Sequence, residues 1–157
     1  MKLSKGFTLL EMLIVLMIIG TILAIASLSY THTKISARNT ERKEELANIQ
    51  IALEAYRSND TYGSYPTSLL VGCSDNGGLS AGGITYLPSI PKDPYCPRRT
   101  YYFSTTPVSC DGTTTPCSDY TLAGALENIT GSCVAEGGCG AGIACNYCLD
   151  SYGQTSQ

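Results

Sequence analysis

The sequence predicts an α+β fold in which one long N-terminal helix carries a small antiparallel β-sheet packed on its distal half, followed by a disulfide-rich C-terminal segment. Three observations lead to this prediction. An apolar run from Phe7 to Leu28 continues into a charged but periodic segment, and no proline occurs before Pro66. Short runs rich in aromatic and β-branched residues follow, as is typical of strands. All eight cysteines lie beyond residue 70.

The run at residues 7–28 is predicted to be a helix that can span a membrane. Glu11 is its only ionisable residue. A helix of this length extends about 33 Å, which matches the hydrocarbon core of a bilayer. Because Lys2 and Lys5 precede the run, we expect the N-terminus in the cytoplasm and the rest of the chain outside.

Residues 29–58 are predicted to continue the same helix as an amphipathic stem. Four apolar residues fall at i, i+3, i+7 and i+10 and form one stripe, namely Leu46, Ile49, Leu53 and Tyr56. We expect one helix from Phe7 to about Arg57, with this stripe facing a small domain. The polar sequence at residues 59–63 ends the helix, and Pro66 prevents its resumption.

Residues 59–157 are predicted to form a β-rich domain. The best strand candidates are residues 100–105 and 119–123. The glycines within residues 72–83 predict a loop, and the prolines within residues 88–97 argue against a central strand there. Residues 131–152 are dense in glycine and cysteine and offer little to bury, so we expect disulfides to hold them.

An even number of cysteines behind an export-type N-terminus predicts disulfides formed in an oxidising compartment. The cysteines are Cys73, Cys96, Cys110, Cys117, Cys133, Cys139, Cys145 and Cys148. Eight cysteines allow about 105 pairings, among which the sequence does not choose. A zinc or redox site at Cys145 and Cys148 is the alternative, but no second CxxC and no nearby histidine accompanies this pair.

Charge and motifs argue against nucleic-acid binding and against catalysis. The net charge is -3, and only Lys92, Arg98 and Arg99 are basic after Asn59. Such a region is a poor phosphate-binding surface, apart from a local basic spot at Arg98 and Arg99. His32 is the only histidine, and no phosphate loop or Ser/His/Asp order occurs. We therefore assign no catalytic residue, no cofactor and no metal.

The N-terminal segment has three interpretations. A secretory signal peptide would be cleaved after Ala26, following the small residues Ala24 and Ala26, and would release a disulfide-rich binding module. An uncleaved anchor is the second interpretation, but it gives no reason for Glu11 inside the hydrocarbon. The third interpretation follows from the residues that precede the apolar run.

Lys5-Gly6 followed by Phe7-Thr8-Leu9-Leu10-Glu11 resembles the leader of type IV pilins and of the pseudopilins of type II secretion. The resemblance implies that prepilin peptidase removes residues 1–6 by cutting after Gly6, and that Phe7 is then methylated. It also implies that Glu11 pairs with the N-terminal amine of a neighbouring subunit. An unpaired carboxylate in lipid is costly and normally marks a pairing. The alternative role for Glu11 is simple capping of the first helical turn.

The same resemblance implies the partners and the location of the chain. It would sit in the cytoplasmic membrane as a single-pass precursor, in contact with lipid and with an inner-membrane assembly platform. It would then join copies of itself and other pilins in a helical filament outside that membrane. Many pilins carry a proline where this chain has Leu28. A kink near that position is therefore less expected here than in those pilins. Gly20, a weak helix former, is the remaining weak point in the helix.

A second resemblance covers Tyr65-Pro66-Thr67, residues 86–95 and Thr100-Tyr101-Tyr102-Phe103. This layout is similar to that of major pseudopilins, which implies a pseudopilin of protein secretion as the alternative to a pilus subunit. Major pseudopilins bind calcium in a later loop. Oxygen ligands are available at Asp111, Asp119 and Asp150, but these residues do not form a clustered motif. The density of cysteines favours the pilus subunit.

Overall fold

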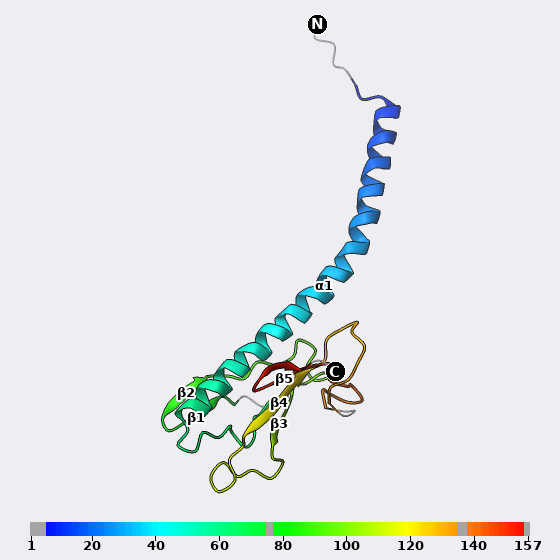
Figure 1. Cartoon of the computed structure of the whole chain (residues 1–157). Coiled ribbons are helices and arrows are strands. Elements are labelled where there is room, and N and C mark those ends of the chain that lie inside the picture. The colour runs from blue at the N-terminus through cyan, green and yellow to red at the C-terminus, as the bar shows by residue number, and fades with distance from the viewer. Residues whose placement is uncertain (1–5, 75–76, 135–137, 156–157) are drawn as a thin grey trace. The chain divides into compact units, whose positions relative to one another are not determined.

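The computed structural model describes residues 6–74, 77–134 and 138–155, including the side chains of all but residues 27–29. The expected leader therefore lies outside the described residues except for Gly6, as do Lys2, Lys5 and the side chain of Leu28. Helix α1 runs from Leu9 to Asn59 and is followed by six strands (Figure 1). This order of elements confirms the predicted α+β class.

Two compact units divide the chain, residues 1–37 and residues 38–157. In the first unit, α1 exposes apolar side chains on every face; for example, Leu9 is 83% exposed and Leu16 is 69% exposed. This part of α1 is long and apolar enough to cross a membrane. The helix continues through Gly20 without a break.

In the second unit, α1 contributes the apolar stripe that the sequence predicts. Leu46, Ile49 and Leu53 are fully buried, and Tyr56 is partly buried. The helix ends at Asn59, two residues beyond the expected end at about Arg57. The Asp60 carboxylate accepts hydrogen bonds from the N–H groups of Tyr62 and Ser64, at 2.9 and 3.0 Å, and thereby forms the turn that follows the helix.

Four strands form an antiparallel sheet in the order β3-β4-β5-β6. The strands are β3 (Tyr102–Thr106), β4 (Asp119–Gly124), β5 (Tyr147–Asp150) and β6 (Gly153–Thr155). Strands β3 and β4 confirm both strand predictions, although β3 begins two residues later than expected. Their register pairs Tyr102 with Ala123 and Thr106 with Asp119.

Two local predictions were wrong. The segment expected to be a loop contains β1 (Leu79–Ala81), which pairs with β2 (Ile84–Leu87) as an antiparallel hairpin. Gly82 and Gly83, which suggested a loop, form its turn with φ angles of +58° and +80°. The segment at 131–152 was expected to offer little to bury, yet it contains β5, in which Cys148 and Leu149 are buried; the disulfides expected there are present.

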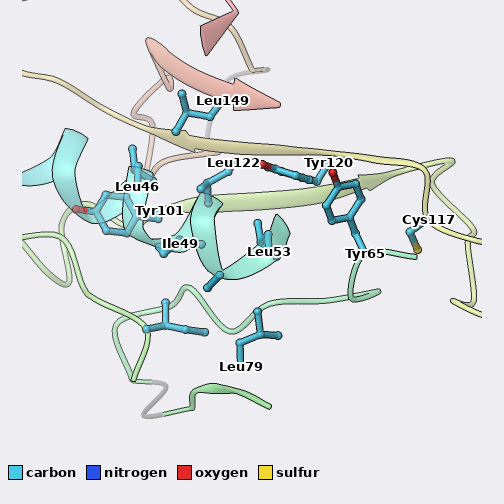
Figure 2. Close-up of a cluster of buried hydrophobic side chains, with 12 residues drawn as sticks. Leu46, Ile49, Leu53, Tyr65, Leu79, Tyr101, Cys117, Tyr120, Leu122 and Leu149 are labelled. Carbon is cyan, nitrogen blue, oxygen red and sulfur yellow. The ribbon is translucent and has the colours of Figure 1, made fainter. Parts of the chain in front are cut away.

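The main core lies between the sheet, the hairpin and the stripe of α1. Figure 2 shows Leu46, Ile49 and Leu53 between the side chains of the sheet on one side and Leu79 on the other. At one end of this row, the rings of Tyr65 and Tyr120 meet edge to face with centroids 4.7 Å apart. Such a pair stabilises by about 0.5–1.5 kcal/mol beyond its buried area.

All eight cysteines form disulfides, which confirms the disulfide-rich part of the predicted fold. The pairs are Cys73–Cys96, Cys110–Cys117, Cys133–Cys148 and Cys139–Cys145. Since Cys145 and Cys148 are each bonded to a different partner, this CxxC holds neither a zinc ion nor a redox pair. Three of these disulfide sulfurs, with Ala123 and Ala125, form a second small core.

Candidate functional site

Glu11 lies in the first turn of α1 and forms a reciprocal cap with Thr8. Its Oε2 atom accepts hydrogen bonds from the Thr8 N–H and the Thr8 hydroxyl, both at 3.0 Å. The Glu11 N–H in turn donates to the Thr8 Oγ1 at 3.2 Å. Thr8 directly precedes the helix and Glu11 is its third residue, which is the arrangement of a capping box. The capping role weighed for Glu11 is therefore present in the single chain.

The surroundings of this cap are apolar and uncovered. Phe7 is 81% exposed, Leu10 is 67% exposed and Met12 is 54% exposed. Among the described residues, the Glu11 Oε1 atom receives no hydrogen bond, so one oxygen remains able to accept another donor. Gly6 and Phe7 precede the helix in irregular backbone, which is the conformation in which a peptide bond is open to a protease.

A second constellation lies in the other unit, where a buried arginine of α1 binds the loop before β3. The side chains of Arg42 and Asp93 are both 0% exposed. Two parallel hydrogen bonds join them, from Nε to Oδ2 at 2.7 Å and from Nη2 to Oδ1 at 3.2 Å. The Asp93 Oδ1 atom also accepts the Tyr95 N–H at 2.7 Å. This geometry fastens the loop at residues 90–95 to α1.

Glu127 extends this constellation towards the surface. Its carboxylate accepts Arg42 Nη1 at 2.9 Å and forms a two-point ion pair with Arg38, at 2.8 and 2.6 Å. The Arg38 hydrogen bonds, followed by those of Arg42, lower the pKa of Glu127 from its ordinary 4.5 to about 2. The guanidinium groups of Arg38 and Arg42 also lie 4.9 and 5.6 Å from the centroid of the Tyr95 ring.

The three carboxylates weighed as calcium ligands do not come together. Asp111 accepts the N–H groups of Thr113 and Thr115 within its own loop. Asp119 accepts an N–H from the β5–β6 turn at 3.1 Å, and Asp150 accepts the Tyr152 N–H at 2.8 Å. Each therefore stabilises a turn. Within residues 6–74, 77–134 and 138–155, no three metal-binding side chains cluster.

These features define a class: a protein with an exposed, apolar N-terminal helix and a disulfide-bonded α+β unit. Within that class, residues 1–27 match the family model described as the prokaryotic N-terminal methylation motif, which is the signature of type IV pilins and pseudopilins. No curated protein and no solved structure matches the chain. The motif supports a processed subunit of the pilin or pseudopilin type, and with the apolar helix it fits a membrane-anchored precursor.

Two sets of contacts are not among the predictions from the sequence. Thr8 belongs to the leader motif, but Thr-Leu-Leu-Glu also fits the pattern of a capping box, which predicts the contact between Thr8 and Glu11. Arg42 lies four residues before Leu46 and therefore continues the buried stripe, so its position in the sequence indicates that its side chain faces the core. The sequence gives no indication that Arg42 contacts Asp93 or Glu127, because these residues lie far apart in the chain.

Proposed function

We propose that this chain is a pilin, which prepilin peptidase cleaves between Gly6 and Phe7 and which then polymerises into a type IV pilus-like filament. The observation that carries the proposal is the methylation motif at residues 1–27, which includes the beginning of a helix whose apolar side chains are exposed on all faces. Such a helix requires a cover on every side, first lipid and then copies of itself. Residues 1–6 are the leader, 7–28 the membrane and filament-core helix, 29–58 the stem and 59–157 the exported domain.

Glu11 has two successive partners in this proposal. Before assembly, Thr8 occupies one carboxylate oxygen, which reduces the penalty of placing a charge near lipid. After cleavage, the amine of Phe7 on a neighbouring subunit binds the other oxygen and sets the register of the growing filament. The N-terminus faces the cytoplasm in the precursor, and the assembly platform in the inner membrane extracts the subunit.

Mass analysis of the N-terminus of the mature protein tests the processing step. The expected N-terminal residue is methylated Phe7, whereas a start at Ser27 would support a cleaved signal peptide and refute the proposal. Glu11→Ala should leave insertion and cleavage intact but should strongly reduce filaments. Glu11→Gln is the matched control, since it retains hydrogen-bonding capacity without the charge. Normal filaments from Glu11→Ala would refute the role in register.

A pseudopilin of type II secretion is the second candidate. The layout of residues 86–95, with the Asp93-Pro94-Tyr95 turn, favours it because that layout is similar to major pseudopilins. Deletion of the gene separates the two candidates. Loss of surface filaments with normal secretion supports the pilin, and loss of secretion without loss of surface filaments supports the pseudopilin.

A further inference from the structure

Two arginines at one end of the second unit carry positive charge that no carboxylate among the described residues pairs with. Arg98 and Arg99 line a hollow of about 260 Å³ together with Tyr95 and Ile143. Within the described part of the chain, neither arginine forms an ion pair. Arg99 donates to the backbone carbonyl of Ala125 at 2.7 Å, while Arg98 is exposed and its side chain forms no hydrogen bond with the described residues.

The backbone that carries these arginines is held firmly. The N–H groups of Arg98 and Arg99 donate to the Tyr95 carbonyl at 2.8 and 3.2 Å, and a disulfide ties Cys96, two residues before Arg98, to Cys73 in another loop. On the other side, Gly140 comes so close that an added Cβ would lie 2.4 Å from the Arg98 carbonyl oxygen. The backbone beneath the hollow is therefore fixed, and the Arg99 guanidinium is held at the Ala125 carbonyl, so part of the positive charge is presented from a fixed position, which favours a docking site.

The opposite end of the same unit carries the complementary charge. Asp60 and Asp111 line a second hollow, of about 310 Å³, whose rim includes the exposed residues Tyr62, Thr67 and Ser68. Both carboxylates accept hydrogen bonds from their own turns but form no ion pair among the described residues. Hydrogen bonds from Thr114, Thr115 and Thr113 lower the pKa of Asp111, which keeps that carboxylate charged.

Helix α1 sets the distance between the two hollows. Arg42 lies beside the Tyr95 ring, at 5.6 Å from its centroid, and Asp60 follows the last residue of the helix. The helix rises about 26 Å from Arg42 to Asn59. The second unit thus has a basic hollow at one end of its helix and an acidic hollow at the other. Two different complementary patches on one subunit are what a head-to-tail, open-ended assembly requires.

We propose that the hollow of Tyr95, Arg98, Arg99 and Ile143 docks the Asp60 and Asp111 end of the next copy of this chain. This contact rests on the proposed function, because it needs a filament in which subunits repeat head to tail. Charge complementarity identifies the occupant: the chain is acidic overall at -3, and its own far end offers two fixed carboxylates. Arginine binds carboxylates at interfaces with planar, two-point hydrogen bonds.

Charge reversal with rescue tests the contact in cells that assemble the wild-type chain. Arg98→Glu should reduce sheared, sedimentable filaments about tenfold relative to the processed subunit, since it sets like charges opposite each other. Arg98→Lys is the matched control: it keeps the charge but loses the two-point geometry, so it should reduce filaments clearly less than Arg98→Glu does. Ser68→Lys adds a cation to the acidic rim without removing the carboxylates that form its turns. Alone it should also reduce filaments, and combined with Arg98→Glu it should restore most of the yield.

The outcomes separate this contact from the proposed function. Normal filaments from Arg98→Glu would overturn the contact and leave the pilin proposal intact. Loss of filaments that Ser68→Lys does not restore would also overturn it, and would indicate a different anionic partner for the basic hollow. Absence of cleavage after Gly6, or of filaments from the wild-type chain, would instead refute the proposed function. Equal protease resistance of the processed variants and wild type would show that each variant folds.

Discussion

Replacement of Asp93 by alanine is the most direct test of the ion network that fastens the loop before β3 to α1. The change removes both hydrogen bonds that Arg42 makes to Asp93 and leaves a fully buried guanidinium with fewer partners. Removing one member of a buried pair costs about 3–5 kcal/mol. Arg42 would keep Glu127 at 2.9 Å and Asn39 at 3.1 Å. We therefore expect a loss near the lower limit, about 3 kcal/mol.

The assay is urea unfolding of the full chain in detergent, followed by near-ultraviolet circular dichroism. The chain has no tryptophan and eleven tyrosines, and all of them except Tyr30 lie in residues 38–157. The signal therefore reports the unit that contains the network rather than the apolar part of α1. A midpoint shift at unchanged slope gives the change in the free energy of unfolding.

Asp150→Ala is the matched control, since the Asp150 side chain accepts one N–H, from Tyr152, and forms no ion pair among the described residues. Its expected loss is about 1 kcal/mol, the contribution of a single hydrogen bond. If Asp93→Ala lost no more than this control, the reasoning about the buried charge would be refuted. Combining Asp93→Leu with Arg42→Met should destabilise less than the sum of the two single changes, because no charge remains unpaired.

Three further predictions concern the same unit. Because the pKa of Glu127 is lowered to about 2, its stabilising contribution should be complete above about pH 4.5 and should decline as the pH falls towards 2; Glu127→Gln should flatten this part of a stability–pH curve. Gly140→Ala should lower the thermal midpoint more than Gly131→Ala, since their φ angles are +125° and +122° but only the Cβ at 140 meets a backbone atom within 4 Å. Thiol reduction should expose residues 73–148 to proteases while the helicity of residues 9–37 persists, and unchanged protease resistance would contradict a stabilising role for the disulfides.

The sequence predicted those elements whose signal is local. The stripe at Leu46, Ile49 and Leu53 follows from helical periodicity, and all three side chains are buried in the structure. Strands β3 and β4 follow from their aromatic and β-branched residues. The hairpin of β1 and β2 was missed because its glycines suggested a loop, although glycines with positive φ are also what a tight turn between strands requires.

Contacts between distant segments could not be predicted in the same way. β5 is a short strand, and Cys148 and Leu149 are buried because it pairs with β4 and β6 and packs into the cores. The disulfide pairing depends on which loops meet in space, so spacing along the chain did not select it. At the N-terminus the motif pointed to Glu11, but predicting its Thr8 partner requires the position of the helix start, which the sequence placed at Phe7 rather than at Leu9.

Folding and assembly depend on different parts of α1, and this makes the proposals separable. Arg42 and the apolar stripe are buried within residues 38–157, whereas Glu11 and the apolar side chains around it are exposed. Glu11→Ala should therefore leave the unfolding midpoint of the second unit unchanged even where filaments are lost. Asp93→Ala should lower that midpoint while cleavage after Gly6 still occurs. A change in the unfolding midpoint caused by Glu11→Ala would show that the two functions of α1 are coupled, and loss of filaments could then no longer be assigned to register.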